Sequence, residues 1–323
     1  MERCFGCLKD DVKGFCSACE KRLFNRSKIN PQLNFNWEDI SKVIDGYPAG
    51  FSISGVQTKG FIGKATGTEL SPSLADSENS IYIIKPLLSS FDLPSDSPAN
   101  EHVTMQMAKQ LYGIRTAECC FMRFANGTPA YVTRRFDYNK DEEKLNQEDF
   151  ASVLKAKKDN DGKYKYDAKS YEDIGDILSP LNKVEFIKIL IFNFLTGNGD
   201  AHLKNFSLLE TPDGDMQLSP SYDLMNTKIH VNDSPIALNL FRELERTSLP
   251  RGRTYTYAIK DFIELGKRFA LRDKLLEKIA KEFEGTENKI KEMVNRSFLS
   301  DRARKKYLET VKKNFVQLFP HAY

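Results

Sequence analysis

The spacing of apolar residues divides the chain into a strand-rich half followed by a mostly helical half. Short runs of β-branched and aromatic residues predict strands at 51–56, 81–86, 119–124 and 130–136. Apolar residues with helical spacing predict helices at 101–112, 183–196, 257–269 and 272–283, and two more between 286 and 319. A further strand is expected at 206–209. Strands with a single helix inserted among them predict an α+β fold rather than a doubly wound sheet.

The composition is that of an ordinary globular protein. Of the 323 residues, 40% are hydrophobic and 29% are charged, which does not suit a disordered chain. The longest apolar run, at 186–195, is interrupted by Lys188 and Asn193. It is too short for a membrane span, which needs about 20 apolar residues. The first residues lack the apolar run of a secretion signal, so we expect a cytoplasmic protein without a membrane partner.

The positive charges do not indicate a nucleic-acid binder. The net charge is only +3, and the densest basic stretch, at 302–306, is followed by interleaved apolar residues up to Leu318. That pattern is typical of an amphipathic helix with a solvated basic face, whereas nucleic-acid binders carry a clustered basic excess. An amphipathic C-terminal helix is therefore expected.

Two Cys-x-x-Cys pairs near the start of the chain have the spacing of a metal site. They are separated by eight residues and comprise Cys4, Cys7, Cys16 and Cys19, the four-cysteine cluster. Four thiolates close a tetrahedral Zn²⁺ site and leave no position open, so the metal would be structural. A redox pair or two local disulfides are the alternatives, although redox motifs normally come singly and open a helix after a strand. The other two cysteines, Cys119 and Cys120, are predicted to be inert thiols in a buried strand.

The loop at 197–205 carries residues that are typical of phosphoryl transfer. It is rich in glycine and follows an apolar helix. Asp200 and Asn205 have the spacing of the catalytic base and a metal ligand in the kinase catalytic loop. Asp223 follows a predicted hairpin and stands where a second Mg²⁺-binding carboxylate would come. Each residue alone would be interpreted as a turn or helix cap, but three in this order favour a kinase.

Two features upstream of this loop support the same chemistry. Lys85 ends an apolar strand, where an unpaired buried ammonium group would be costly. Glu101 on the next helix is a candidate ion-pair partner, as in the lysine–glutamate pair of kinases; a solvent-facing position for Lys85 is the alternative. Before the strand, the small residues of 52–60 together with Lys59 suit phosphate binding by backbone N–H groups. This loop lacks the P-loop pattern.

Together these motifs resemble the HipA family of bacterial Ser/Thr kinases, the toxins of persistence-related toxin–antitoxin modules. The resemblance covers about residues 50–320, with the motifs in the family's order. The stretches that carry it are Ser52–Lys59, Ile84–Pro86, Asn100–His102, Arg134–Asp137, Gln147–Phe150, Asn198–Phe206 and Ser221–Leu224. It implies a two-lobed, protein-kinase-like fold. The expected organisation is a zinc knuckle at 1–28, a strand-rich N-lobe at 29–150 and a helical catalytic C-lobe at 151–323.

The resemblance also implies a role for each motif. Asp200 would be the catalytic aspartate, and Asn205 and Asp223 would bind Mg²⁺. Lys85 would hold the α- and β-phosphates of ATP. The other implied nucleotide-binding residues are Ser54, Gly55, Val56, Gln57, Thr58 and Lys59 of the phosphate loop, Glu148, Asp149 and Phe150 of the hinge facing adenine, and His202, Lys204 and Tyr222. Ser52 occupies the position of the family's autophosphorylated serine, with Ser54 as a second candidate, and a phosphate there would eject the loop from the nucleotide pocket.

The chain departs from the best-known family members in two ways. They carry a longer N-terminal subdomain than the fifty or so residues that precede the serine loop here, and they lack the four-cysteine cluster. The chain thus resembles the shortened HipT-like toxins of three-component HipBST systems. Partners implied by this resemblance are a HipB-like helix-turn-helix antitoxin and a small HipS-like protein, with DNA only indirectly through the antitoxin.

The expected activity is transfer of the γ-phosphate of ATP to a serine or threonine hydroxyl of a protein. By analogy with the family, the substrate could be an aminoacyl-tRNA synthetase, and the chain would be a toxin. Two rivals stay open. One is a small-molecule phosphotransferase, because antibiotic kinases share an Asp-to-Asn loop of similar spacing. The other is a non-catalytic protein that binds nucleic acid or an antitoxin.

Overall fold

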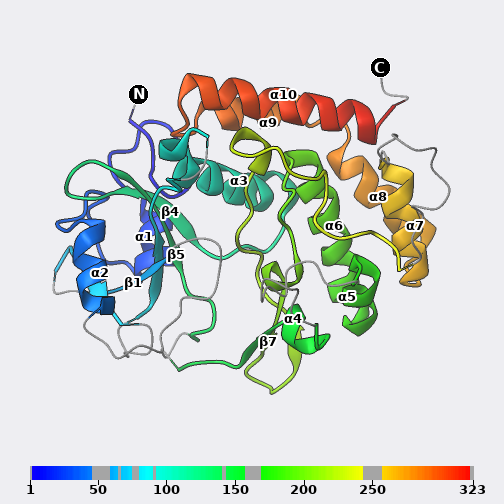
Figure 1. The fold of residues 1–323 in the computed structure, drawn as a ribbon, viewed down its shortest axis with the longest axis horizontal. Helices are drawn as coiled ribbons and strands as arrows, with labels where there is room; N and C mark the ends of the chain where they lie inside the picture. Colours follow the sequence, from blue (N-terminus) through cyan, green and yellow to red (C-terminus); the bar gives the residue numbers. More distant parts are fainter. Residues whose placement is uncertain are drawn as a thin grey trace. The chain divides into compact units, whose positions relative to one another are not determined.

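The computed structural model of the chain describes residues 2–45, 59–64, 67–74, 80–89, 92–139, 143–156, 169–242 and 257–320. The chain forms two compact units (Figure 1). Unit 1 comprises Met1–Gln106, Ala117–Lys144 and Glu292–Arg304, and unit 2 comprises Met107–Thr116, Leu145–Lys291 and Lys305–Tyr323. The expected strand at 51–56 lies outside the described residues. The domain boundaries at 28 and 150 stay a prediction.

Unit 1 contains a five-stranded antiparallel sheet in the order β2-β1-β3-β5-β4. Its strands are β1 (Gly60–Lys64), β2 (Leu70–Ser73), β3 (Tyr82–Lys85), β4 (Cys119–Arg123) and β5 (Pro129–Arg134). The strands predicted at 81–86, 119–124 and 130–136 are thereby confirmed. Because β3 lies in the middle of the sheet, its end residue Lys85 pairs with Tyr131 of β5 and is not on an edge strand.

Helix α3 (Ser97–Tyr112) follows β3 after the short 3-10 helix η1 (Pro94–Asp96). It begins earlier than the predicted Glu101, with Pro98 in its first turn. A helix tolerates proline there because the first N–H groups have no intrahelical partner. The helix ends before Gly113, whose φ of +62° is the left-handed conformation in which glycine commonly ends a helix.

The outer edge of β4 is covered by the N-terminal part of the chain. The N–H of Phe121 donates to the carbonyl of Phe5 at 2.9 Å, and the N–H of Arg123 donates to the carbonyl of Pro31 at 3.0 Å. The N–H of Leu33 in turn donates to the carbonyl of Arg123 at 2.8 Å. The polar segment 30–34 thus pairs with β4 and satisfies an otherwise open strand edge. Helices α1 (Ser17–Phe24) and α2 (Trp37–Asp45) lie on either side of this segment in the chain.

Unit 2 is mainly helical, as predicted. Its apolar helix α6 (Pro180–Thr196) is buried over most of its length. The other helices that lie in unit 2 or extend into it are α4 (Phe150–Val153), α5 (Tyr171–Ile177), α7 (Ile259–Arg268), α8 (Asp273–Phe283), α9 (Glu287–Asn295) and α10 (Asp301–Leu318). Helix α10 buries Tyr307, Val311 and Phe315 and exposes Lys305 and Lys312, which confirms the amphipathic C-terminal helix.

A second antiparallel sheet in unit 2 has the order β6-β7-β8. The predicted strand at 206–209 corresponds to β7 (Ser207–Glu210), and its partners are β6 (Gln147–Asp149) and β8 (Met216–Leu218). The two partners have only three residues each, too short a stretch for a clear alternation of apolar and polar positions. Among the described residues, no helix is both long enough and apolar enough to cross a bilayer.

The start of α3 offers a test of how unit 1 is held together. The buried carboxylate of Asp96 accepts hydrogen bonds from the Ser300 N–H at 2.6 Å and the Ser300 hydroxyl at 2.8 Å. We expect Asp96→Ala to lower the free energy of unfolding by about 2 kcal/mol, because both donors lose a charged acceptor. Chemical denaturation measures this loss. The control is Asp301→Ala, since Asp301 is 98% exposed and its ion pair with Arg304 is worth about 0.5 kcal/mol or less. Equal losses in the two variants would contradict the prediction.

Candidate active site

The described part of unit 1 contains a buried ion pair between β3 and α3. The Lys85 Nζ atom lies 2.7 Å from the Glu101 Oε1 atom, and the two side chains are only 6% and 1% exposed. The ammonium group also lies 5.4 Å from the centre of the Tyr131 ring. The alternative that Lys85 faces solvent at an edge is therefore wrong. Since removing one partner of a buried pair leaves an uncompensated charge, the two residues depend on each other.

The neighbour of Glu101 on α3 is a fully buried histidine. Burial lowers the pKa of His102 to about 4, so the ring is neutral at physiological pH. Its Nε2 atom lies 2.7 Å from the carbonyl oxygen of Gly6. A carbonyl can only accept, so this nitrogen carries the proton and donates it. Consecutive residues of this motif thus contact two different parts of unit 1: Glu101 bonds to Lys85 and His102 bonds to Gly6.

In unit 2, the loop before Asp200 is shaped by two glycines and one threonine. Gly197 has a φ of +76° and ends α6. A Cβ atom on Gly199 would lie 2.2 Å from the carbonyl oxygen of Ser234, so no side chain fits there. The hydroxyl of Thr227, on the 3-10 helix η3 (Thr227–Ile229), accepts a bond from the Gly199 N–H at 2.9 Å and lies 3.0 Å from the Gly197 carbonyl.

The structure brings two predicted magnesium ligands together. The amide Nδ2 of Asn205 donates to the Asp223 carboxylate at 3.3 Å, and its Oδ1 accepts from the His202 N–H at 3.0 Å. Asp223 has a φ of +57°, a left-handed conformation that is uncommon for a residue other than glycine and often occurs at functional sites. An amide oxygen and a carboxylate suit Mg²⁺, which takes its other ligands from phosphates and water. The donor set of this pair therefore fits the ion.

Three other predicted nucleotide-binding residues are neighbours of this pair in the chain. His202 is nearly buried and precedes the 3-10 helix η2 (Leu203–Asn205). The Tyr222 hydroxyl donates to the carbonyl of Lys204 at 2.7 Å. Burial raises the pKa of Tyr222, so its phenol stays protonated. This bond links the residue before Asp223 to the residue before Asn205. A pocket in unit 2 is lined by residues of this region, including Asn198, Asn205, Ser221 and Tyr222.

The predicted hinge residues lie directly beside β7. Glu148 pairs with Leu208, and the N–H of Phe150 donates to the Phe206 carbonyl at 3.0 Å. The Phe150 ring is fully buried. The Asp149 carboxylate accepts a bond from the N–H of Ser152 at 2.9 Å and so begins α4. The predicted hinge segment is therefore joined by backbone bonds to the strand that follows the Asp200 loop.

The predicted phosphate loop is described only at its last residue. Ser52, Ser54, Gly55, Val56, Gln57 and Thr58 lie outside the described residues. Lys59 is half-buried and directly precedes β1.

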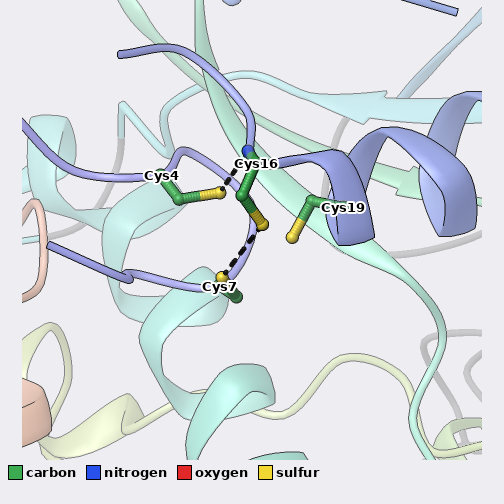
Figure 2. A group of neighbouring side chains, drawn as sticks. All are labelled: Cys4, Cys7, Cys16 and Cys19. Carbon is green, nitrogen blue, oxygen red and sulfur yellow. Dashed lines mark hydrogen bonds between the residues drawn. The ribbon is translucent and has the colours of Figure 1, made fainter. Parts of the chain in front are cut away.

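The four-cysteine cluster comes together in unit 1 (Figure 2). The four sulfur atoms lie within 4.8 Å of one another, and those of Cys7 and Cys16 are 3.7 Å apart. A tetrahedral Zn²⁺ site holds its sulfurs about 3.8 Å apart. All the cysteines are free, so the structure contains no local disulfides. The Cys16 N–H donates to the Cys4 sulfur at 3.2 Å, and hydrogen bonds from neighbouring thiols, above all Cys19, lower the pKa of Cys4. The cluster fits a thiolate-binding metal.

Burial raises the pKa of Cys119 to about 12, and it also raises the pKa of Cys120. Both lie in the strand β4. They have the properties of the inert thiols predicted from the sequence.

Sequence reasoning missed the residues that support the Asp200 loop. The Asn198 amide donates to the Asn193 side chain at 3.0 Å and accepts from the Asp200 N–H at 3.2 Å. Asn198 lies in the glycine-rich loop at 197–205, which the sequence had already indicated, so Asn198 could have been singled out there. Thr227 carries no such signal, because nothing in the sequence around it indicates a contact with residues about 30 positions earlier.

The sequence is similar to one known protein family and to individual kinases. Residues 51–290 match the family described as HipA-like C-terminal domain. A Haemophilus influenzae protein that carries the name of a kinase is 27% identical over 309 residues, covering 89% of this chain and 88% of that protein. The Shewanella oneidensis Ser/Thr-protein kinase toxin HipA is 32% identical over 83 residues, which is 25% of this chain and 18% of the toxin.

The fold is also similar to a solved structure. In the complex of Shewanella oneidensis HipA with HipB and operator DNA, the matching chain has a TM-score of 0.63 and 20% identity. The match covers 90% of this chain and 72% of that chain. The likeness shows a shared mixed fold of sheets and helices.

The support of the Asp200 loop by Thr227 can be tested. Thr227→Val keeps the shape of the side chain but leaves the buried Gly199 N–H without an acceptor. We expect the free energy of unfolding to fall by about 1–3 kcal/mol, measured by chemical denaturation. The control is Thr196→Val, because the buried Thr196 hydroxyl donates only to carbonyls within its own helix. A Thr227 variant as stable as the Thr196 variant would contradict the assigned support.

Proposed function

This chain belongs to the HipA-like C-terminal domain family, and on that premise we propose that it is an ATP-dependent protein Ser/Thr kinase. The observation that carries the proposal is the hydrogen bond between Asn205 and Asp223, which lies 18 residues later in the chain. Asn205 belongs to the same loop as Asp200. The buried Lys85–Glu101 pair is the second support. These are the residue types that protein kinases use for metal, base and phosphate contacts.

In the proposed reaction, a serine or threonine oxygen attacks the γ-phosphorus of ATP, the bond to the β–γ bridging oxygen breaks and ADP leaves. Asp200 orients the hydroxyl group and accepts its proton. Asn205 and Asp223 are the residues that would hold Mg²⁺, which offsets the charge of the phosphates. Lys85, kept in place by Glu101, contacts the α- and β-phosphates. The remaining nucleotide contacts are assigned to 54–59, 148–150, His202, Lys204 and Tyr222.

We also propose that the chain is a compact HipT-like toxin that phosphorylates itself at Ser52 or Ser54. The HipT-like form rests on the family resemblance, and the Haemophilus influenzae protein matches this chain over 89% of its residues. A HipB-like antitoxin is proposed because the similar Shewanella oneidensis chain was solved with HipB and operator DNA. A small HipS-like partner and an aminoacyl-tRNA synthetase substrate rest on family analogy alone.

The four-cysteine cluster is proposed to bind a structural Zn²⁺ ion. The close approach of the sulfurs, the N–H bond to Cys4 and the bond from the Arg22 guanidinium to Cys19 at 3.4 Å support this assignment. We expect about one zinc per chain by elemental analysis, because four thiolates fill the coordination sphere. Cys7→Ser should lose most of the metal, whereas Cys120→Ser, a buried cysteine outside the cluster, should keep it. A zinc-free parent protein would contradict the assignment.

The kinase assignment is tested with ATP labelled on its γ-phosphate. In the presence of Mg²⁺, we expect label on Ser52 or Ser54, located by mass spectrometry. Asp200→Asn should slow the labelling at least about 100-fold, because the proton acceptor is lost, while the free energy of unfolding changes little. The control is Asp213→Asn, an exposed aspartate in the β7–β8 turn, which should label as the parent does. Turnover of a small alcohol without protein labelling would instead favour the small-molecule phosphotransferase.

The non-catalytic alternative makes a different prediction in cells. If the chain acts only by binding, Asp200→Asn should arrest growth as strongly as the parent. If it acts as a kinase, the growth arrest should disappear with the labelling. Growth curves after induced expression measure this difference.

A further inference from the structure

A hydrogen bond connects Gly6, the residue before Cys7 of the four-cysteine cluster, to the helix that carries Glu101. The His102 Nε2–H donates to the Gly6 carbonyl at 2.7 Å, across 96 positions of the chain. His102 is fully buried, and its ring lies 6.0 Å from that of Phe298 and 6.5 Å from that of Phe121. The ring therefore has a defined orientation toward Gly6. The function proposed above assigns no role to this bond.

The position of the Gly6 carbonyl depends on the cluster. Gly6 directly precedes Cys7, and a Cβ atom on it would lie 2.6 Å from the Cys19 sulfur. The loop thus passes so close to a third thiol that only glycine fits. A metal that holds the four sulfurs would also hold this peptide group, because metal binding supplies the folding energy of small cysteine loops.

Two polar contacts act on the rotation of α3 about its own axis, in addition to the packing of its other buried side chains. Glu101 and His102 are consecutive, so their side chains leave the helix about 100° apart. One bonds to Lys85 of β3 and the other to Gly6 beside the cluster. A buried ion pair is favourable only with good geometry. Loss of the Gly6 contact would remove the polar constraint on the His102 face of α3 and would weaken the Lys85–Glu101 geometry.

We propose that the metal-bound four-cysteine cluster positions α3 through the His102–Gly6 hydrogen bond, so that ATP affinity depends on Zn²⁺ at the cluster. His102 is a positioning residue in this scheme, since it acts through Glu101 and Lys85. The inference rests on the proposed function for the role of Lys85 in nucleotide binding. It goes beyond that function because it makes the position of the proposed nucleotide-binding lysine depend on a structural metal site.

The first experiment separates this hydrogen bond from general stability. His102→Leu removes the donor, and we expect the dissociation constant for Mg²⁺-ATP to rise about tenfold while zinc content stays at the parent level. His102→Gln offers an N–H donor of similar reach and should restore affinity to within about twofold. The control is Tyr82→Phe, which removes the buried bond from the Tyr82 hydroxyl to the Leu23 carbonyl. That bond also joins the N-terminal segment to the sheet but bypasses α3, so affinity should stay within about twofold of the parent.

Amide hydrogen exchange gives a readout that does not require nucleotide binding. In His102→Leu, the amides of 97–106 should exchange about tenfold faster, whereas those of α6 in unit 2 should match the parent. Unchanged ATP affinity together with unchanged exchange at 97–106 would overturn the proposal. Equal losses in His102→Leu and Tyr82→Phe would overturn it as well, because they would indicate general destabilisation.

Metal removal from the full-length parent protein provides a second test if His102→Leu does not fold. After chelation, ATP affinity should fall at least about tenfold and return when Zn²⁺ is added back, with the same change in exchange at 97–106. Parent-like affinity and exchange in zinc-free protein would reject the proposal. If the zinc-loaded parent binds no ATP at all, the proposed kinase function fails, and the exchange at 97–106 still decides whether the cluster positions α3.

Discussion

The buried ion pair between Lys85 and Glu101 is the interaction on which the architecture of unit 1 depends. Both side chains are almost completely removed from water, so neither charge is stable without the other. The pair requires β3 in the centre of the sheet and α3 at a defined rotation. The strand order, the early start of α3 and the Asp96–Ser300 bonds all maintain that arrangement.

In unit 2 the constraint is different, because the polar groups of the loop at 197–205 have to be held in fixed positions. The backbone at Gly197 and Gly199 is too crowded or too strained for side chains, and Thr227 supplies the hydrogen bonds that this backbone needs. Asp223 adopts a left-handed conformation in spite of its side chain. Such strain persists only where surrounding contacts over-determine the backbone. The bonds to Asn205 and through Tyr222 provide those contacts.

The N-terminal segment links the four-cysteine cluster to the sheet. It covers the edge of β4 with backbone bonds and packs the Phe5 ring against Phe298 at 5.0 Å. The segment buries Phe15, Leu23 and Phe24 in the core that it shares with the sheet, and a metal bound by the four cysteines would add to its stability. The same segment contacts α3 through Gly6. Its packing against the sheet and its proposed effect on the lysine–glutamate pair therefore involve the same segment.

Local patterns in the sequence determined much of this protein. The spacing of apolar residues was sufficient to predict the central strands and the long helices. Burial of one face repeats apolar residues every 2 positions in a strand and every 3.6 in a helix. Residue spacing was sufficient to predict that the four cysteines come together and to single out the loop at 197–205, since the residues of each motif lie close together in the chain. Only the tertiary structure decided that Lys85 is buried and that segment 30–34 pairs with β4. The bonds from Thr227 to Gly199 and from His102 to Gly6 likewise join distant positions through backbone groups, which are the same in every residue and leave no pattern in the sequence.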